Sequence, residues 1–130
     1  MQLIQTGAKG LDELLGGGLP KGKCVLVVGS PGAGKTILLM QFLRSGAIAD
    51  ERGLYVAMDE TPEQVKANLS SFRWNLDELE VGGRLLFLDA TMLRHGGSRM
   101  SASLLLGGEE IAAEPRMTVR FLVETITRIV

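Results

Sequence analysis

The stretch Gly29-Ser30-Pro31-Gly32-Ala33-Gly34-Lys35-Thr36 fits every fixed position of the pattern G-x-x-x-x-G-K-[ST]. It follows the apolar run Cys24-Val-Leu-Val-Val28, which predicts a buried strand, and it precedes Ile37-Leu-Leu-Met-Gln-Phe-Leu43, which predicts a helix. A strand, a glycine-rich turn and a helix in this order are the context that a phosphate-binding loop needs. The simpler alternative, a glycine-rich turn with a lysine at the helix end, does not explain why all fixed positions and both flanks fit together.

The residue types of this loop explain how it could hold a di- or triphosphate. Gly29, Gly32 and Gly34 carry no Cβ, so the backbone can turn tightly and approach a ligand closely. Main-chain N–H groups and the positive end of the helix that starts near Gly34 would then face one anion. Lys35 would neutralise β- and γ-phosphate oxygens, and the hydroxyl of Thr36 would bind a Mg²⁺ that bridges them.

The composition describes an ordinary globular protein. The chain has 130 residues, of which 45% are hydrophobic and 22% charged, so a single ordered domain is expected. The formal net charge of −1 offers no electrostatic reason to expect nucleic acid or an anionic membrane as partner. No apolar run could span a bilayer, and Met1-Gln-Leu-Ile lacks the basic start of a secretion signal, which favours a cytoplasmic protein. The single cysteine, Cys24, is expected to be a small core residue.

Hydrophobic periodicity and breaker residues predict the remaining elements. The strand over 24–28 and a second strand over Leu54–Met58, joined by a helix reaching about Ser45, would form a parallel βαβ unit. The other expected elements are a short helix over 10–15 ended by glycines, a helix from Pro62 to near Arg73, a helical turn over Trp74–Leu79 with Trp74 as packing anchor, a strand over Leu85–Leu88, and a helix over Val119–Val130.

Two adjacent carboxylates follow the second predicted strand. Asp59 and Glu60 would lie at the carboxyl end of that strand, where parallel sheets gather ligand-binding residues. One could orient or deprotonate the water that attacks a γ-phosphate. The competing interpretation is structural: Thr61, Pro62 and Gln64 form a capping box at a helix start, where negative charge is favourable in any case. The residues alone leave both interpretations open.

The later residues carry weaker signals. Asp89 ends the third predicted strand, as a magnesium-binding Walker B aspartate would, but an ordinary strand-end aspartate gives the same local pattern. His95 has no second metal-type ligand near it in the sequence and is expected to be a solvated loop residue. Arg94 and Arg99 could contact phosphate, but without aromatic neighbours they are more simply surface residues.

Taken together, several short motifs resemble the KaiC-like ATPases of the RecA superfamily. They cover about the first ninety residues well and the rest loosely. The matching residues are Thr6-Gly7, Gly10-Leu11-Asp12, Leu14 to Gly22, the phosphate loop, Gln41-Phe42-Leu43, Tyr55-Val56 through Asp59-Glu60-Thr61-Pro62, and then Phe72, Trp74 and Leu85 to Asp89.

This resemblance implies an α/β P-loop NTPase of RecA type, with a mostly parallel sheet flanked by helices and residues 1–130 as one partial ATPase domain. It implies ATP and Mg²⁺ as cofactors and an acidic catalytic residue among Asp59 and Glu60, alongside Lys35. The first acidic position is commonly Glu in the family, so Asp59 departs from the pattern. Family members typically form hexameric rings or related homo-oligomers, with nucleotide bound near subunit interfaces, and other protein partners are possible.

The resemblance also reassigns Asp89 to a non-catalytic strand, because the family's Walker B strand comes after a helix like Val119–Val130. By that comparison the domain looks truncated before the Walker B strand, and exposed strand-edge groups and an apolar helix face are expected. Three functions follow as hypotheses. They are a KaiC-like ATPase whose hydrolysis drives assembly or conformational change, a nucleotide-binding module without turnover, and a recombinase- or helicase-like motor acting on DNA.

Overall fold

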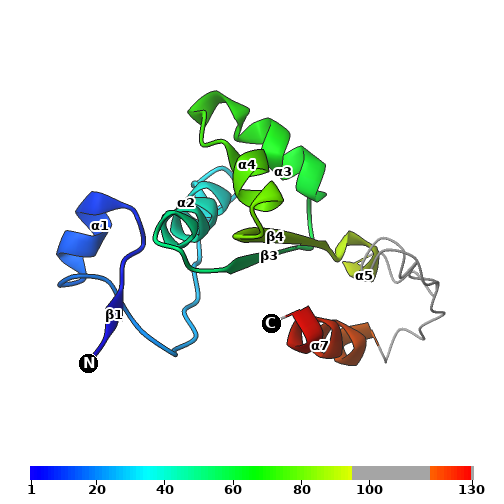
Figure 1. Ribbon diagram of the computed structural model, residues 1–130, viewed down its shortest axis with the longest axis horizontal. Coiled ribbons are helices and arrows are strands. Elements are labelled where there is room, and N and C mark those ends of the chain that lie inside the picture. The colour runs from blue at the N-terminus through cyan, green and yellow to red at the C-terminus, as the bar shows by residue number, and fades with distance from the viewer. Residues whose placement is uncertain (95–117, 130) are drawn as a thin grey trace. The chain divides into compact units, whose positions relative to one another are not determined.

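A computed structural model describes residues 1–94 and 118–129 of the chain. These residues form a mixed α/β structure with a small parallel sheet, as the sequence predicts (Figure 1). The elements, in chain order, are β1 (Leu3–Ile4), α1 (Lys9–Leu14), β2 (Leu19–Pro20), α2 (Lys35–Ile48), β3 (Gly53–Ala57), α3 (Pro62–Asn68), the 3-10 helix η1 (Ser70–Phe72), α4 (Leu76–Val81), β4 (Leu85–Asp89), α5 (Thr91–Arg94) and α7 (Thr118–Ile129).

The chain divides into two compact units, which are described separately. The first comprises Met1–Tyr55 with Lys66–Leu86, and the second comprises Val56–Val65 with Phe87–Val130. In the first unit the buried side chains include Met40 and Ala47 of α2, together with Leu69, Leu76 and Leu85. Among the helices that the structure describes, none has the length and apolar content needed to cross a membrane.

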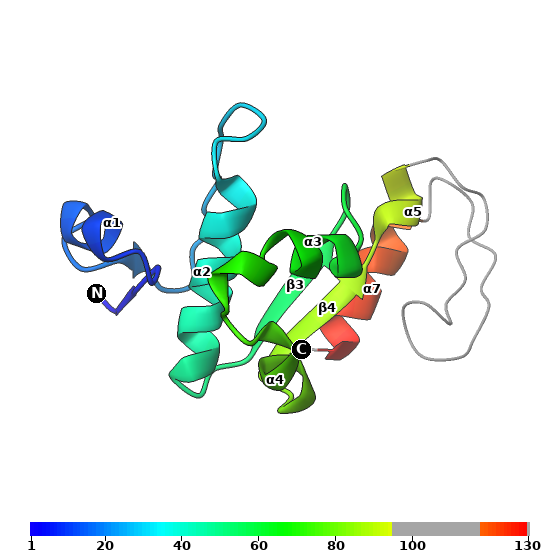
Figure 2. The ribbon, with the colours of Figure 1, turned by 90° about the horizontal axis from the view of Figure 1, so that it is seen from above.

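Strands β3 and β4 form the parallel sheet. The N–H of Gly53 donates to the carbonyl oxygen of Arg84 at 2.8 Å, and further along the N–H of Ala90 donates to the carbonyl oxygen of Ala57 at 2.7 Å. Both strands therefore advance in the same direction, and Figures 1 and 2 show them side by side. The strands predicted at Leu54–Met58 and Leu85–Leu88 are confirmed to within one residue at each end.

The segment Cys24–Val28 is not a strand, and this prediction was wrong. Leu26 is 85% and Val28 81% exposed, and Cys24 is also exposed rather than a core residue. A strand exists only when neighbouring backbone completes its hydrogen bonds. In the described part of the chain, β1 pairs with β2 and β3 with β4, so neither sheet includes this segment. The predicted parallel pairing of 24–28 with the strand after α2 is therefore corrected: the partner of β3 is β4.

Helix α2 lies against α4 (Figure 1), and its Arg44 also contacts an aromatic pair, Phe72 and Trp74, that precedes α4 in the chain. The Nε of Arg44 donates to the carbonyl oxygen of Trp74 at 3.3 Å, and the guanidinium lies 5.9 Å from the centre of the Trp74 ring. The rings of Phe72 and Trp74 stack with their centroids 4.7 Å apart. Trp74 is thus the packing anchor that the sequence predicts.

Helix α3 begins as expected but ends early. The N–H of Thr61 donates to Oε1 of Gln64 at 2.8 Å, and the N–H of Gln64 donates to Oγ1 of Thr61 at 3.2 Å, which is the predicted capping box. The helix ends at Asn68 rather than near Arg73. After Leu69 the chain continues as the 3-10 helix Ser70–Phe72, and Arg73, with φ of 54°, ends that helix in a left-handed conformation.

At the other end of the described chain, α7 matches the helix predicted over Val119–Val130 to within one residue at each end. Helix α5, which the sequence analysis did not predict, includes Arg94. The predictions for His95 and Arg99 lie outside the described residues, as does the whole segment between α5 and α7.

The N-terminal segment is organised by a turn at Thr6 and Gly7. The carboxylate of Asp12 in α1 accepts the N–H of Thr6 at 2.8 Å, its hydroxyl at 2.7 Å and the N–H of Gly7 at 3.3 Å. The backbone and side-chain hydrogen bonds from Thr6 lower the pKa of Asp12 below its ordinary value of 3.8. Strands β1 and β2 pair antiparallel beside this turn, with Leu3 opposite Pro20.

The lowered pKa predicts an acid dependence of stability. The folded-state pKa of Asp12 lies below the unfolded value, so its contribution is complete above pH 3.8 and is lost as pH falls through the folded pKa. We expect the unfolding midpoint in urea to fall more steeply in the wild type than in Asp12→Asn when both are titrated from about pH 5 downward. Glu13→Gln, an exposed neighbour in α1, is the control and should retain the wild-type slope. Equal slopes for Asp12→Asn and wild type would contradict this assignment.

Candidate functional site

The predicted phosphate loop joins the segment 24–28 to the start of α2. The N–H of Ala33 donates to the carbonyl oxygen of Ser30 at 3.1 Å, which closes a tight turn around Pro31 and Gly32. Residues 29–33 are exposed, and Figure 2 shows the loop at the N-terminal end of α2. The backbone of this loop is therefore open to a ligand from solvent.

Gly34 connects the loop to the helix. Its φ of 101° is left-handed, and its carbonyl oxygen accepts the N–H of Leu38 at 3.0 Å, the first hydrogen bond of α2. The N–H groups of the first helical turn have no acceptor within a helix, so they form a positive end to which an anion can bind. Helix α2 has 14 residues, which is long enough for a full dipole to develop at that end.

Lys35 bridges the two ends of the loop. Its Nζ donates to the carbonyl oxygen of Gly29, six residues earlier. A Cβ built on Gly29 would lie 3.1 Å from Cβ of Ala33, which is a crowded distance, and 3.6 Å from Cγ and Cδ of Lys35, which is ordinary contact. An ionised phosphate oxygen is a stronger acceptor for an ammonium group than a neutral carbonyl. A bound phosphate could therefore replace the carbonyl oxygen of Gly29 as the acceptor of the Lys35 ammonium group.

The donor set of the loop fits a nucleotide phosphate with its magnesium ion. Exposed main-chain N–H groups, one ammonium and the half-buried hydroxyl of Thr36 meet at the start of α2. Oxygen ligands of this kind suit Mg²⁺, which retains several waters and phosphate oxygens and needs few protein ligands. The described residues contain no group of three or more His, Cys, Asp or Glu side chains that could hold a metal by itself.

Asp59 and Glu60 follow β3. The strand ends at Ala57, and Met58 separates it from the two exposed carboxylates, which directly precede the capping box of α3. They belong to the second unit, whereas the phosphate loop belongs to the first. Their catalytic role stays a prediction.

Asp89 has a local structural function. It is the last residue of β4, and its Oδ1 accepts the N–H of Thr91 at 3.0 Å and the hydroxyl of Thr91 at 2.6 Å. These hydrogen bonds form an Asx turn that leads from β4 into α5. They explain an aspartate at this strand end without a metal.

One contact near the loop was not predicted. The side-chain Nε2 of Gln41 in α2 donates to the carbonyl oxygen of Gly7 at 3.1 Å. Both residues belong to motifs that carry the family resemblance, but they stand 34 positions apart. Because no periodic pattern relates two such distant residues, only an alignment of covarying positions could have indicated this contact.

Comparison with known proteins agrees with this geometry. A family model described as "ATPase: KaiC" matches residues 4–130. The chain belongs to the KaiC ATPase family. Membership supports a nucleotide-binding, ATPase-like domain built as a fragment of a RecA-type P-loop fold, in agreement with the resemblance of the motifs.

Individual relatives cover the same region. A protein named UPF0273 from Thermotoga maritima is 46% identical over 87 residues, which are 67% of this chain and 36% of the relative. The circadian clock oscillator protein KaiC of Prochlorococcus marinus is 39% identical over 92 residues, 70% of this chain and 18% of its own length. KaiC of Parathermosynechococcus lividus is 44% identical over 88 residues, 67% of this chain and 16% of its own. The chain thus spans about a third of the UPF0273 relative.

The left-handed backbone of Gly34 predicts a cost for any side chain there. No atom lies within 4 Å of a Cβ built on Gly34, so Gly34→Ala should destabilise only through backbone strain, by about 1–2 kcal/mol. Gly10→Ala is the matched control, because Gly10 is helical in α1 and also has open space around it. Alanine there should stabilise by about 0.5–1 kcal/mol. Urea unfolding measures both, and effects of equal sign would contradict the loop conformation.

Proposed function

We propose that this chain binds ATP with Mg²⁺ through residues Gly29–Thr36 and, within a homo-oligomer, hydrolyses ATP to ADP and phosphate. The observation that carries the proposal is the exposed loop with a left-handed Gly34 at the start of a 14-residue helix, in a chain of the KaiC ATPase family. Following the family resemblance, hydrolysis would drive assembly or a conformational change.

Each residue of the loop has a distinct task in this proposal. Main-chain N–H groups of Gly32 and Gly34 and of the first turn of α2 hold phosphate oxygens. Lys35 leaves the carbonyl of Gly29 and neutralises oxygens of the β- and γ-phosphates. The hydroxyl of Thr36 ligates the metal, which when bound neutralises charge that develops on the phosphates.

Asp59 or Glu60 would act on the attacking water. A carboxylate can orient that water and accept its proton, a contribution that general-base catalysis typically makes to hydrolysis. Support comes from their position after the first strand that follows α2 and from the resemblance to family members with an acidic residue there. The assignment between the two is left to experiment.

We also propose that residues 1–130 belong to one RecA-like ATPase domain of a cytoplasmic protein, and that this domain assembles with copies of itself, in the family's manner as a hexameric ring. The span of the family match, from residue 4 to residue 130, supports the single domain, and the family resemblance is the reason to propose the ring. A subunit interface would complete the nucleotide site with residues from a neighbour.

Removal of the loop lysine tests nucleotide binding. Lys35→Ala should weaken the affinity for ATP and Mg²⁺ at least about tenfold, since a charge-assisted hydrogen bond to phosphate is lost. Calorimetric titration measures this. The control is Lys9→Ala, because Lys9 is the first residue of α1 just as Lys35 is the first of α2. Equal affinity in wild type and Lys35→Ala would refute the assignment of the loop.

The carboxylates are tested by turnover. In the assembled protein we expect Asp59→Asn or Glu60→Gln to slow phosphate release about a hundredfold or more while ATP affinity changes little. Glu63→Gln, an exposed carboxylate in the first turn of α3, should leave the rate unchanged. ATP binding without any phosphate release from the wild type would instead support the nucleotide-binding module without turnover.

A further inference from the structure

A polar clasp joins the N-terminal segment to helix α2. We define the clasp as Thr6, Gly7, Asp12 and Gln41. Asp12 holds the Thr6–Gly7 turn by three hydrogen bonds, the hydroxyl of Thr6 accepts the N–H of Ala8 at 3.1 Å, and Gln41 donates to the carbonyl oxygen of Gly7. Thr6 is polar but only 3% exposed, so its hydrogen bonds must be made to protein groups rather than to solvent.

The Thr6–Gly7 turn also lies in close contact with α2. Gly7 has φ of 83°, and a Cβ built on it would lie 2.8 Å from Cβ of Ser45 and 3.0 Å from the carbonyl oxygen of Gln41. No side chain could be accommodated at these distances without moving α2 or the turn. The N-terminal segment therefore contacts the helix backbone itself.

The clasp closes a ring that contains the phosphate loop. Gln41 lies six residues after Lys35, or about 9 Å along the helix axis. In the other direction, the chain that enters the loop comes from β2, which pairs with β1, and β1 ends at Ile4, two residues before the turn. The N-terminal end of the loop is thus connected to Thr6 and Gly7 through β2 and its pairing with β1. The C-terminal end is connected to them through α2 and the hydrogen bond of Gln41.

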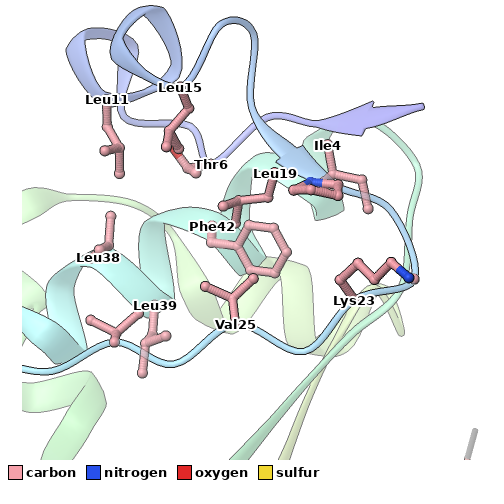
Figure 3. A pocket seen from close by; sticks show the side chains of 13 residues that line it. Ile4, Thr6, Leu11, Leu15, Leu19, Lys23, Val25, Leu38, Leu39 and Phe42 are labelled. Carbon is pink, nitrogen blue, oxygen red and sulfur yellow. The ribbon is translucent and has the colours of Figure 1, made fainter. Parts of the chain in front are cut away.

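Apolar packing inside this ring is incomplete. A cavity of about 410 Å³ lies between the N-terminal segment and α2 (Figure 3). Leu11 and Leu15 of α1 face it from one side, and Leu38 and Phe42 of α2 from the other. Side chains separated by such a space lose much of their dispersion attraction. The hydrogen bonds of the clasp must therefore supply part of what fixes α2 against the N-terminal segment.

We propose that the clasp positions the first turns of α2, and with them Lys35 and Thr36, for phosphate binding. Gln41 and Thr6 are positioning residues, because they act on the loop through the helix and do not touch a phosphate themselves. The expected effect of the clasp on nucleotide affinity rests on the proposed function. The expected effect of the clasp on the stability of α2 does not.

The test uses Gln41→Met, which keeps the length of the side chain and removes the donor. Without nucleotide, we expect amide hydrogen exchange at Leu38, Leu39 and Met40 to become about threefold to tenfold faster, the effect of about one hydrogen bond, while exchange in β4 is unchanged. Gln5→Met, in an exposed side chain just before the turn, is the matched control. Wild-type exchange at these three amides in Gln41→Met would overturn the proposal, and so would equal acceleration in β4, which indicates general destabilisation.

Thr6 supplies a second pair of variants. Thr6→Val removes the hydroxyl at constant shape and should reproduce the faster exchange, whereas Thr6→Ser keeps the hydroxyl and should restore wild-type exchange. Calorimetry with ATP and Mg²⁺ should show a Kd about threefold to tenfold higher in Gln41→Met and Thr6→Val. The titrations are run at a temperature below the thermal unfolding midpoint of each variant. A wild type that does not bind ATP would refute the proposed function alone, since hydrogen exchange still decides the clasp. Unchanged Kd in both variants of a wild type that binds ATP would overturn the positioning of the phosphate site.

Discussion

The predicted phosphate loop depends on one backbone constraint: a left-handed residue must stand between the loop and the first residue of α2. Gly34 meets it with φ of 101° and at the same time accepts the first hydrogen bond of the helix. Any L-residue with a side chain would resist this conformation. Because the constraint lets α2 start immediately after the tight turn at Ser30–Ala33, the lysine, the hydroxyl of Thr36 and the positive helix end all occur within two residues of each other.

Helix α2 carries this site, yet it is held by few deeply buried side chains. Met40 and Ala47 are its fully buried residues among those described. On one side Arg44 donates to the carbonyl of Trp74 and lies over the indole ring, and on another Gly7 approaches the helix backbone while Gln41 donates to its carbonyl. Polar and cation–π contacts therefore help to fix the orientation of α2, whose apolar interface is modest. This arrangement gives the N-terminal motifs of the family a physical reason to accompany the loop.

The loop and the carboxylates are assigned to the proposed function on different grounds. The loop is contiguous in sequence, so its residue types and spacing are interpretable from the sequence itself and agree with membership of the KaiC ATPase family. The carboxylates Asp59 and Glu60 follow a different element and lie in a different unit of the structure, so their assignment rests on order along the chain and on resemblance. Asp89 illustrates the difference, because its sequence pattern fitted a metal ligand and an ordinary strand-end aspartate equally, whereas its hydrogen bonds to Thr91 give it a role in the turn before α5.

Features that act over a few residues were determined by the sequence alone. The capping box of Thr61 and Gln64, the start of α2, the strands β3 and β4 and the helix α7 all follow from local propensity and periodicity. Tertiary structure alone decided the rest: Cys24–Val28 has the composition of a buried strand but is exposed, and Gly7 meets Gln41 across 34 positions. The physical reason is that strand pairing and burial depend on partners that are distant in the chain, whereas caps and turns complete their hydrogen bonds within three or four residues.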